Sequence, residues 1–188
     1  SDEELEAEDG RRMLVDVEAL SASVHEGYTC VECHADIEEV PHEEKLTEVR
    51  CQICHEETQD EYLAGVHGAA TAHGDPDAPS CSDCHGSHDI RGAGDTNSMV
   101  HPRNQPETCA RCHADPKLVR RHPITVPAPV AAYKQSGHYK ALNGEADSAA
   151  PTCSDCHGTH DLKPSRDAES PIHWQNVPET CGTCHADI

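Results

Sequence analysis

Residues 81–85 read Cys81-Ser82-Asp83-Cys84-His85, and the same pattern, Cys-x-x-Cys-His, occurs six times in the 188 residues. The six copies use all twelve cysteines of the chain. The pattern is typical of c-type haem attachment, in which two thiols form thioethers to one porphyrin and the next histidine becomes the proximal iron ligand. We therefore predict six covalent haems. The attachment cysteines are Cys30, Cys33, Cys51, Cys54, Cys81, Cys84, Cys109, Cys112, Cys153, Cys156, Cys181 and Cys184, and the proximal histidines are His34, His55, His85, His113, His157 and His185.

Zinc sites and disulfides are the two simpler interpretations of paired cysteines. A zinc ribbon needs two such pairs but no histidine directly after each one. Histidine makes up only 16 of 188 residues, so its presence after all six pairs is not a chance result of composition. Disulfides leave these histidines equally unexplained, and the pattern favours haem.

The composition argues against an ordinary hydrophobic core. Leu, Ile, Val and Phe together contribute 26 residues, about 14 % of the chain, and the formal net charge is −21. Such a composition is typical of disordered proteins unless another apolar material replaces the missing side chains. Six porphyrins, one for about 31 residues, supply that material, and we expect the haem-free chain to be unfolded. With only 14 Lys and Arg, the chain is not expected to bind nucleic acid.

The location is predicted from the same features. Haem attachment of this type takes place outside the cytoplasm, and the sequence begins at Ser1 without an apolar leader, as in a mature, exported protein. No stretch approaches 18 apolar residues, so we expect no transmembrane segment. We expect an extracellular or cell-surface location, with the periplasm as the alternative.

An internal repeat organises the chain. The segment Cys81 to Ile90 matches Cys153 to Leu162, and His101 to Cys109 matches His173 to Cys181, each at an offset of 72 residues. We predict one continuous haem-chain domain with four parts: an acidic arm (1–21), dihaem unit 1 (22–60), dihaem unit 2 with a Pro-rich connector (61–130) and dihaem unit 3 (131–188).

The predicted fold is dominated by haem, with irregular coil, short α-helices and almost no β-structure around a chain of six haems. Short helices are expected over residues 60–70 and 130–142, each presenting a histidine toward the next unit. Residues 2–9 are expected to form an acidic helical turn or an extended arm. The 13 prolines and 12 glycines break the remainder into loops.

Six irons need six further axial ligands, and ten histidines remain after the proximal six. Only Met13 and Met99 offer thioethers, so the supply favours bis-histidine, low-spin haems of low potential. His88 and His160 stand three residues after a proximal histidine and are expected to reach a neighbouring haem. The six best candidates for distal ligands are His25, His42, His67, His88, His138 and His160.

The other histidines have simpler interpretations. His101 and His173 are reserve ligands, whose alternative role is a hydrogen bond to a propionate or a loop carbonyl. His73 and His122 have no repeat counterparts and are expected at the surface. Gly86 and Gly158 follow proximal histidines, where a side chain would meet an adjacent ring. Asp89 and Asp161 are expected either to orient the preceding imidazole or to cap a turn.

With these motifs the chain resembles the multihaem c-type cytochromes of metal-reducing and other anaerobic microbes. The resemblance implies a closely spaced haem chain of alternating stacked and T-shaped pairs. Some such cytochromes form extracellular filaments in which a histidine ligates a haem of the next subunit, and His25, His88 and His160 are the matching positions here. The resemblance is carried by Ser23 to His25, Cys30 to Asp36, Pro41-His42, Val66 to Gly68, Cys81 to Ile90 and Pro106 to Cys109.

The leading functional interpretation is a non-enzymatic electron carrier for extracellular electron transfer. Its expected partners are other redox proteins, extracellular acceptors and copies of itself in a head-to-tail conductive filament. His185 lies three residues from the end of the sequence, which suggests that the last haem is exposed at one end. A soluble periplasmic shuttle is the alternative. A multihaem reductase is a further alternative, although such catalysis needs an iron with an open position.

Overall fold

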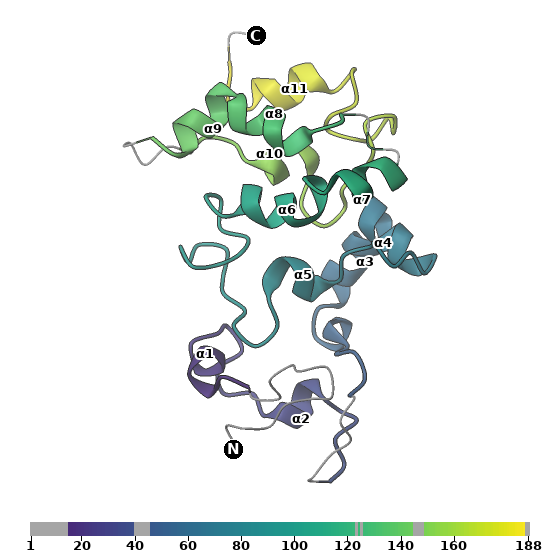
Figure 1. Cartoon of the computed structure of the whole chain (residues 1–188), viewed down its shortest axis with the longest axis vertical. Helices are drawn as coiled ribbons and strands as arrows, with labels where there is room; N and C mark the ends of the chain where they lie inside the picture. The colour runs from purple at the N-terminus through teal and green to yellow at the C-terminus, as the bar shows by residue number, and fades with distance from the viewer. Residues whose placement is uncertain (1–14, 40–45, 123, 125, 145–148, 187–188) are drawn as a thin grey trace.

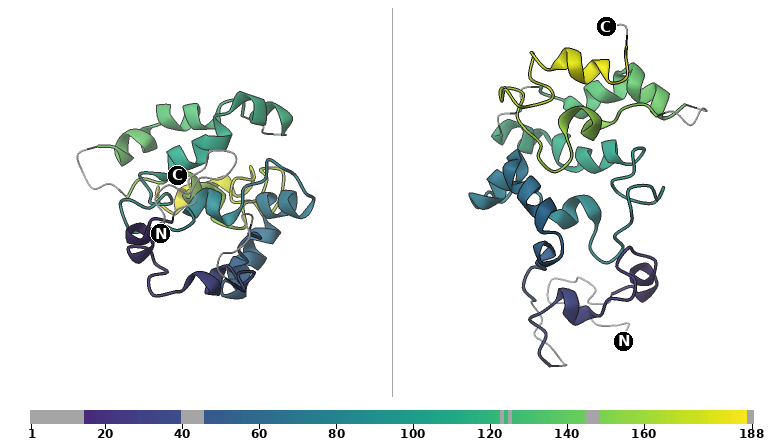
Figure 2. Two further views of the ribbon diagram at one scale, coloured as in Figure 1. Left: turned by 60° about the horizontal axis from the view of Figure 1, so that its bottom comes forward. Right: turned by 180° about the vertical axis from the view of Figure 1, so that it is seen from behind.

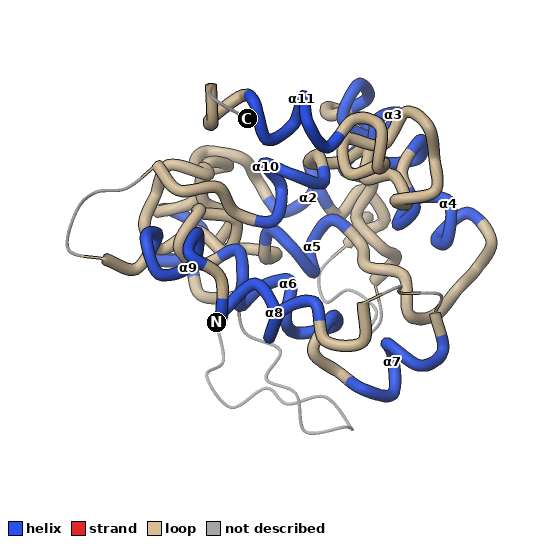
Figure 3. The backbone as a smooth tube through the Cα atoms, turned by 90° about the horizontal axis from the view of Figure 1, so that it is seen from above, coloured by secondary structure: helices blue, strands red, loops and turns tan. Residues whose placement is uncertain are grey.

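The computed structural model describes residues 15–39, 46–122, 124, 126–144 and 149–186. In this part of the chain, short helices alternate with irregular coil and no β-strand is present (Figure 3). The prediction of short helices with almost no β-structure is confirmed there, whereas the expectation for residues 2–9 lies outside the described residues. The helices are α1 (Val17–Ser21), α2 (Cys30–Cys33), the 3₁₀ helix η1 (Cys51–Ile53), α3 (Glu56–Ala64), α4 (Val66–Ala72), α5 (Cys81–His85), α6 (Gln105–His113), α7 (Pro116–Arg121), α8 (Pro129–Gln135), α9 (Gly137–Leu142), α10 (Cys153–His157) and α11 (Val177–Gly182).

The two predicted histidine-bearing helices are each divided into a helix pair. Gly65 separates α3 from α4 with φ −89° and ψ 171°, and Ser136 separates α8 from α9 with φ −71° and ψ 163°. Both residues are extended, so one helix ends and the next begins in a new direction. The prediction of one continuous helix in each place is therefore wrong.

The stretches 61–117 and 131–188 repeat the same side-chain hydrogen bonds. In each, a tyrosine from the first helix of the pair donates to the carbonyl that lies two residues before a Cys-x-x-Cys-His motif. In each, an asparagine before the second motif helix donates its side-chain amide to a serine carbonyl. The bonds are Tyr62 Oη to Pro79 O (2.6 Å), Tyr133 Oη to Pro151 O (2.9 Å), Asn104 Nδ2 to Ser98 O (2.9 Å) and Asn176 Nδ2 to Ser170 O (2.9 Å).

The polypeptide buries very little of its own apolar surface. In the described residues the buried hydrophobic side chains are Val130 (9 % exposed) and Leu142 (2 % exposed). The chain exposes 13570 Å², whereas a folded monomer of 20.4 kDa is expected to expose about 8,800 Å². This excess is what a polypeptide that folds around a large apolar cofactor would show without it.

The helices are arranged along a long axis in approximately the order of the sequence. In Figure 1, α1 and α2 lie at one end, α5 and α6 in the middle, and α11 at the other end. The view from behind shows the same order (Figure 2). None of the described helices has the length and apolar character needed to cross a bilayer.

Candidate haem sites

All six Cys-x-x-Cys-His motifs begin within a helical turn. A helix brings residues i and i+3 to the same face, so the two thiols of each motif point to the same side. The histidine that follows continues or ends that turn, which places its imidazole next to both sulfurs in sequence and in space. The motifs lie on α2, η1, α5, α6, α10 and α11.

A capping box fixes the helix of the first motif in each predicted dihaem unit. Before α5, the backbone N–H of Ser80 donates to the Asp83 carboxylate at 2.7 Å, and the Ser80 hydroxyl donates to it at 2.8 Å. An acidic residue directly before the second cysteine thus satisfies backbone donors that the first helical turn leaves open. Equivalent bonds join Thr29 N to Glu32 (2.7 Å) and Thr152 N to Asp155 (2.7 Å).

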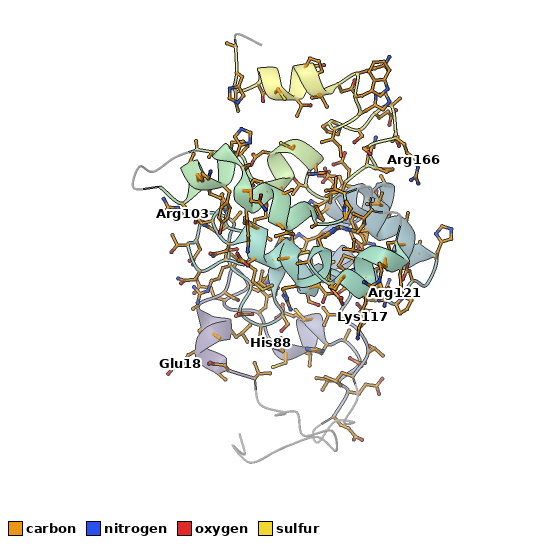
Figure 4. All side chains as sticks on the ribbon, turned by 45° about the horizontal axis from the view of Figure 1, so that its top comes forward. Glu18, His88, Arg103, Lys117, Arg121 and Arg166 are labelled. Carbon is orange, nitrogen blue, oxygen red and sulfur yellow. The ribbon has the colours of Figure 1, made fainter. Side chains whose placement is uncertain are left out.

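Five of the six proximal histidines have a second histidine ring beside them. In every case this second histidine is one of the six best candidates for distal ligands. His88, labelled in Figure 4, lies beside the ribbon of α2, the helix that leads into His34. The ring-centroid distances are 6.0 Å for His25 and His55, 6.1 Å for His34 and His88, 6.1 Å for His67 and His113, 6.1 Å for His85 and His160, and 6.0 Å for His138 and His185.

These distances fit two imidazoles on opposite sides of one iron. A metal–nitrogen bond of about 2 Å on each side, with each nitrogen about 1 Å from its ring centre, separates the centroids by about 6 Å. Directly packed aromatic rings have centroids about 4.5–7 Å apart, so the distinguishing feature is that all five pairs have nearly the same separation, 6.0–6.1 Å. The buried Nδ1 of His34 has no hydrogen-bond partner, so no bond of that ring competes with a ligand role.

The five histidine pairs follow two rules, one for the first motif and one for the second motif of each predicted dihaem unit. The proximal histidine of a second motif is paired with a histidine that precedes the first motif of the same unit. His67 and His113 illustrate this rule, and so do His25 with His55 and His138 with His185. The expectation that His67 and His138 face the next unit is therefore not met.

The proximal histidine of a first motif is instead paired with a histidine of the following unit. His34 of unit 1 lies beside His88 of unit 2, and His85 of unit 2 lies beside His160 of unit 3. His25, His88 and His160 all have proximal partners within this chain. We therefore do not propose these three histidines as ligands that cross between subunits.

The same two junctions are joined by a backbone hydrogen bond. The N–H of Val24, next to His25, donates to the carbonyl of Ile90 at 2.8 Å. The N–H of Val66, next to His67, donates to the carbonyl of Leu162 at 2.7 Å. In each junction the segment that carries the crossing histidine is thus held against the start of the preceding unit.

The close approach at the second junction requires a glycine. A Cβ atom on Gly65 would lie 2.7 Å from the carbonyl oxygen of His160 and 2.9 Å from the amide nitrogen of Leu162. Both are backbone atoms, which cannot move aside as the end of a flexible side chain can. Gly65 therefore lets the segment with His160 reach the position beside His85.

His157 differs from the other five proximal histidines. Within the described residues no other histidine ring lies beside it, although the described part contains nine of the ten remaining histidines. The candidate distal ligand His42 lies outside the described residues. The histidine supply favours two histidines at every iron, but the described part of the chain provides no second histidine at His157.

The reserve histidines take part in local turns. His101 Nδ1 accepts a hydrogen bond from the backbone N–H of Arg103 at 3.2 Å, and His173 Nδ1 accepts one from Gln175 at 3.4 Å. Neither ring lies beside a proximal histidine in the structure. These contacts are to backbone N–H groups rather than to the loop carbonyls that the sequence suggested.

His73 and His122 have different surroundings. His73 is exposed and its Nδ1 lies 2.6 Å from the carbonyl of Ala69. His122 is half-buried, and its Nε2 lies 2.8 Å from the carboxylate of Asp77, which also binds Arg121 at 2.6 Å. The expectation of a surface position therefore fits His73 but not His122.

Gly86 and Gly158 are required for a reason other than an adjacent ring. Both residues have positive φ, +82° and +86°, a backbone conformation that other residues rarely adopt. A Cβ on Gly86 would also lie 2.6 Å from a carboxylate oxygen of Asp89, and one on Gly158 would lie 3.1 Å from Asp161. The two aspartates thus pack against the turn that follows each motif.

The electrostatic surroundings keep several of the paired imidazoles neutral, which is the form that binds iron. Burial lowers the pKa of His67, His85 and His113, and neighbouring histidines lower it further. On the distal side, His160 Nδ1 lies 3.5 Å from the carboxylate of Glu61. A carboxylate at Nδ1 can orient the ring, and it leaves Nε2 available as a ligand. No local sequence pattern points to Glu61, because it lies 99 residues before His160.

The thiols of consecutive motifs lie near one another along the whole chain. A hydrogen bond with Cys153 raises the pKa of the Cys109 thiol and lowers that of Cys153. Thioether sulfurs do not ionise, so in a haem-loaded chain only their proximity persists. Interactions that affect thiol pKa values join Cys33 to Cys51, Cys51 to Cys81, Cys84 to Cys112, Cys109 to Cys153 and Cys156 to Cys181.

The alternative uses of paired cysteines find no support in the geometry. All twelve cysteines are free thiols. In the described part of the chain, the group that places three possible metal ligands within 4.8 Å of one another is Asp75, Asp77 and His122, without a cysteine. Asp77 is already engaged by Arg121, so this group forms an ion-pair cluster.

Comparison with known proteins yields one informative relative. No protein-family model and no solved structure matches the chain. The chain is 24 % identical over 177 residues to the multiheme cytochrome MtrA of Shewanella baltica (strain OS185). The aligned region covers 73 % of this chain and 52 % of the relative. The chain thus spans about half the length of that relative. This similarity supports a multihaem cytochrome that carries c-type haems and transfers electrons.

Proposed function

We propose that this protein is a hexahaem c-type cytochrome that carries electrons along closely spaced, mainly bis-histidine, low-spin haems. The observation that carries the proposal is the coincidence of six attachment motifs with five histidine pairs at 6.0–6.1 Å. In this proposal the twelve cysteines form the thioethers and the six motif histidines are the proximal ligands. The distal ligands are His25, His67, His88, His138 and His160.

The residues of the chain would prepare each iron for electron transfer. When bound, each haem supplies a one-electron iron couple. Two neutral imidazoles hold that iron in place on both sides, and all-histidine ligation favours a low potential. Because cysteines of consecutive motifs lie near one another from the first motif to the sixth, the haems would form one path through the predicted units 22–60, 61–130 and 131–188.

Export and a place in extracellular electron transfer are the finer parts of the proposal. Covalent haem attachment favours a location outside the cytoplasm, at the cell surface or beyond it. The placement of α1 and α2 at one end and α11 at the other (Figure 1) favours transfer from end to end. Head-to-tail association of such a molecule would produce a conductive filament, and electron microscopy of native material tests this part.

A reductase is the second candidate, and the observation that favours it is the absence of a described histidine beside His157. An iron with one protein ligand could take nitrite or hydroxylamine at its open position. The leading proposal predicts no turnover of either compound by the reduced protein. Sustained turnover that is abolished by cyanide would favour the reductase.

Potentiometric titration of the native protein tests the electron-carrier proposal. Absorbance in the haem bands should follow several one-electron steps at low potential, with complete reversal on oxidation. The proposal would be contradicted if the native protein lacked haem absorbance or took up no electrons at low potential. The soluble-shuttle alternative predicts the same titration but monodisperse particles in the microscope.

A further inference from the structure

The missing partner of His157 follows from the rule that pairs the first motif of each unit. His34 and His85 are each paired with a histidine from the next unit along the chain, His88 and His160. His157 is the corresponding proximal histidine of unit 3. By the same rule its partner would come from a unit that follows residues 131–188.

A second and independent observation concerns the backbone at the start of unit 3. Gly137 corresponds to Val66 of unit 2 and Val24 of unit 1, because each directly precedes the distal histidine of its unit. The N–H groups of Val24 and Val66 donate to a carbonyl of the following unit. The N–H of Gly137 has no acceptor in the part of the chain that the structure describes.

The burial of these residues shows the same difference. Ser23 (6 % exposed) and Gly65 are buried, whereas the corresponding Ser136 is only half-buried. The approach at the second junction is close, because a Cβ on Gly65, the counterpart of Ser136, would lie 2.7 Å from a backbone oxygen of unit 3. The edge formed by residues 136–138 therefore lacks the neighbour that covers the two equivalent edges.

We propose that the haem at His157 receives its second axial ligand from a histidine of a partner haem unit that docks along residues 136–138. The inference rests on the haem assignment of the proposed function. One partner segment would satisfy both observations, because in both internal junctions a single segment supplies the histidine and, two residues later, the carbonyl that accepts the backbone N–H.

The internal junctions also define the chemistry of the partner segment. The two segments read His88-Asp89-Ile90 and His160-Asp161-Leu162, and each stands three residues after a motif histidine. Both already serve the preceding unit of this chain. The partner is thus a further c-type haem unit with a free histidine, followed by an aspartate and an aliphatic residue.

The test uses the full haem-loaded chain at a concentration where light scattering shows a monomer. The probe is a synthetic peptide of residues 158–163 (Gly-Thr-His-Asp-Leu-Lys), with a His160→Ala peptide as the control. Electron paramagnetic resonance of the oxidised protein should show one high-spin iron in six. The peptide should convert that iron to low spin at lower concentration than free imidazole does, and the control peptide should not.

A variant pair tests the docking edge itself. Gly137→Pro removes the N–H at the first position of α9, where proline is tolerated, and the extended Ser136 (ψ 163°) is compatible with a following proline. We expect it to weaken peptide binding several-fold, as loss of one hydrogen bond does. Gly137→Ala keeps the N–H and should bind the peptide as the unmodified protein does.

Two results would overturn the inference. Six low-spin irons in the monomer would mean that the chain completes the site by itself, with His42 as the next residue to replace. A high-spin iron that binds the peptide no better than imidazole, or equally well in Gly137→Pro, would mean a site for small ligands. In either case six haems would still be present, whereas a protein without six haems would contradict the proposed function instead.

Discussion

The stretches 61–117 and 131–188 have the same internal contacts but different neighbours. Each holds a histidine pair at about 6 Å, His67 with His113 and His138 with His185. At the start of the helix that carries His67, the N–H of Val66 donates to the carbonyl of Leu162, whereas the N–H of Gly137, at the start of the helix that carries His138, has no acceptor in the described residues. The comparison shows that the motif histidine of the second motif is paired within each unit, whereas the motif histidine of the first motif is paired only where a following unit supplies a histidine.

The largest expected effect concerns what the two stretches share, their dependence on haem. The chain buries two hydrophobic side chains in its described part, so it lacks the apolar core that normally offsets the loss of conformational entropy. We expect the chain produced without haem attachment to be unfolded in both stretches. Far-ultraviolet circular dichroism and hydrogen exchange measure this, and a cooperative, helical haem-free chain would contradict it.

The next prediction tests whether the complete site is the same in both stretches. His67→Ala and His138→Ala should each leave one iron with a single protein ligand, so each variant should gain one high-spin, carbon monoxide-binding haem. The control variants His101→Ala and His173→Ala remove only a turn contact and should gain none. If His67→Ala gained a high-spin haem and His138→Ala did not, the two sites would not be equivalent.

A smaller effect is expected from the contact that distinguishes the two stretches. Gly65→Ala places a methyl group against the backbone of residues 160–162, and such overpacking costs about 2 kcal/mol. For a chain of this length that corresponds to a decrease in Tm of roughly 4–8 °C. Gly137→Ala, on the exposed edge, should leave the Tm of the isolated chain unchanged. Equal Tm values for both variants would show that the unit 2–unit 3 junction is not formed.

The smallest effect is expected at the ion-pair cluster, which joins Asp77 of the stretch 61–117 to Arg121 and His122 just after it. Hydrogen bonds from Arg121 and His122 lower the pKa of Asp77. A carboxyl group with a lowered pKa stabilises the fold above its ordinary pKa, and this contribution is lost as the pH falls through the lowered value. Asp77→Asn should therefore lower the Tm slightly at pH 7. The difference should begin to shrink as the pH falls below about 4 and should vanish only below the lowered pKa of Asp77. A difference that persists in acid would point to lost packing.

The sequence predicts the residues of each motif more directly than it predicts which residues lie together in space. The motifs lead to a prediction of the attachment cysteines and proximal histidines, because attachment chemistry is local in the chain. Five of the six best candidates for distal ligands lie beside proximal histidines, although their ligand roles remain predictions. Which histidine faces which motif could not be derived, because the pairs join residues of different helices and often of different units.

The wrong prediction of continuous helices has the same physical cause, a contact between residues far apart in the sequence. Residues 60–70 have a continuous helical composition, but the chain breaks at Gly65 where Val66 donates its N–H to Leu162. That acceptor lies 96 residues later in the sequence, so no local pattern reveals it. By contrast, the capping acids Glu32, Asp83 and Asp155 follow a local signature that the sequence analysis overlooked.

The central claim is that every Cys-x-x-Cys-His motif carries a covalent haem. Mass spectrometry of the intact, denatured native protein tests it directly, because thioether-bound haem stays on the chain when axial ligands are lost. We predict the mass of the chain plus six haems as a single species. A mass that corresponds to fewer haems, or to a chain with free thiols and bound zinc under native conditions, would contradict the account.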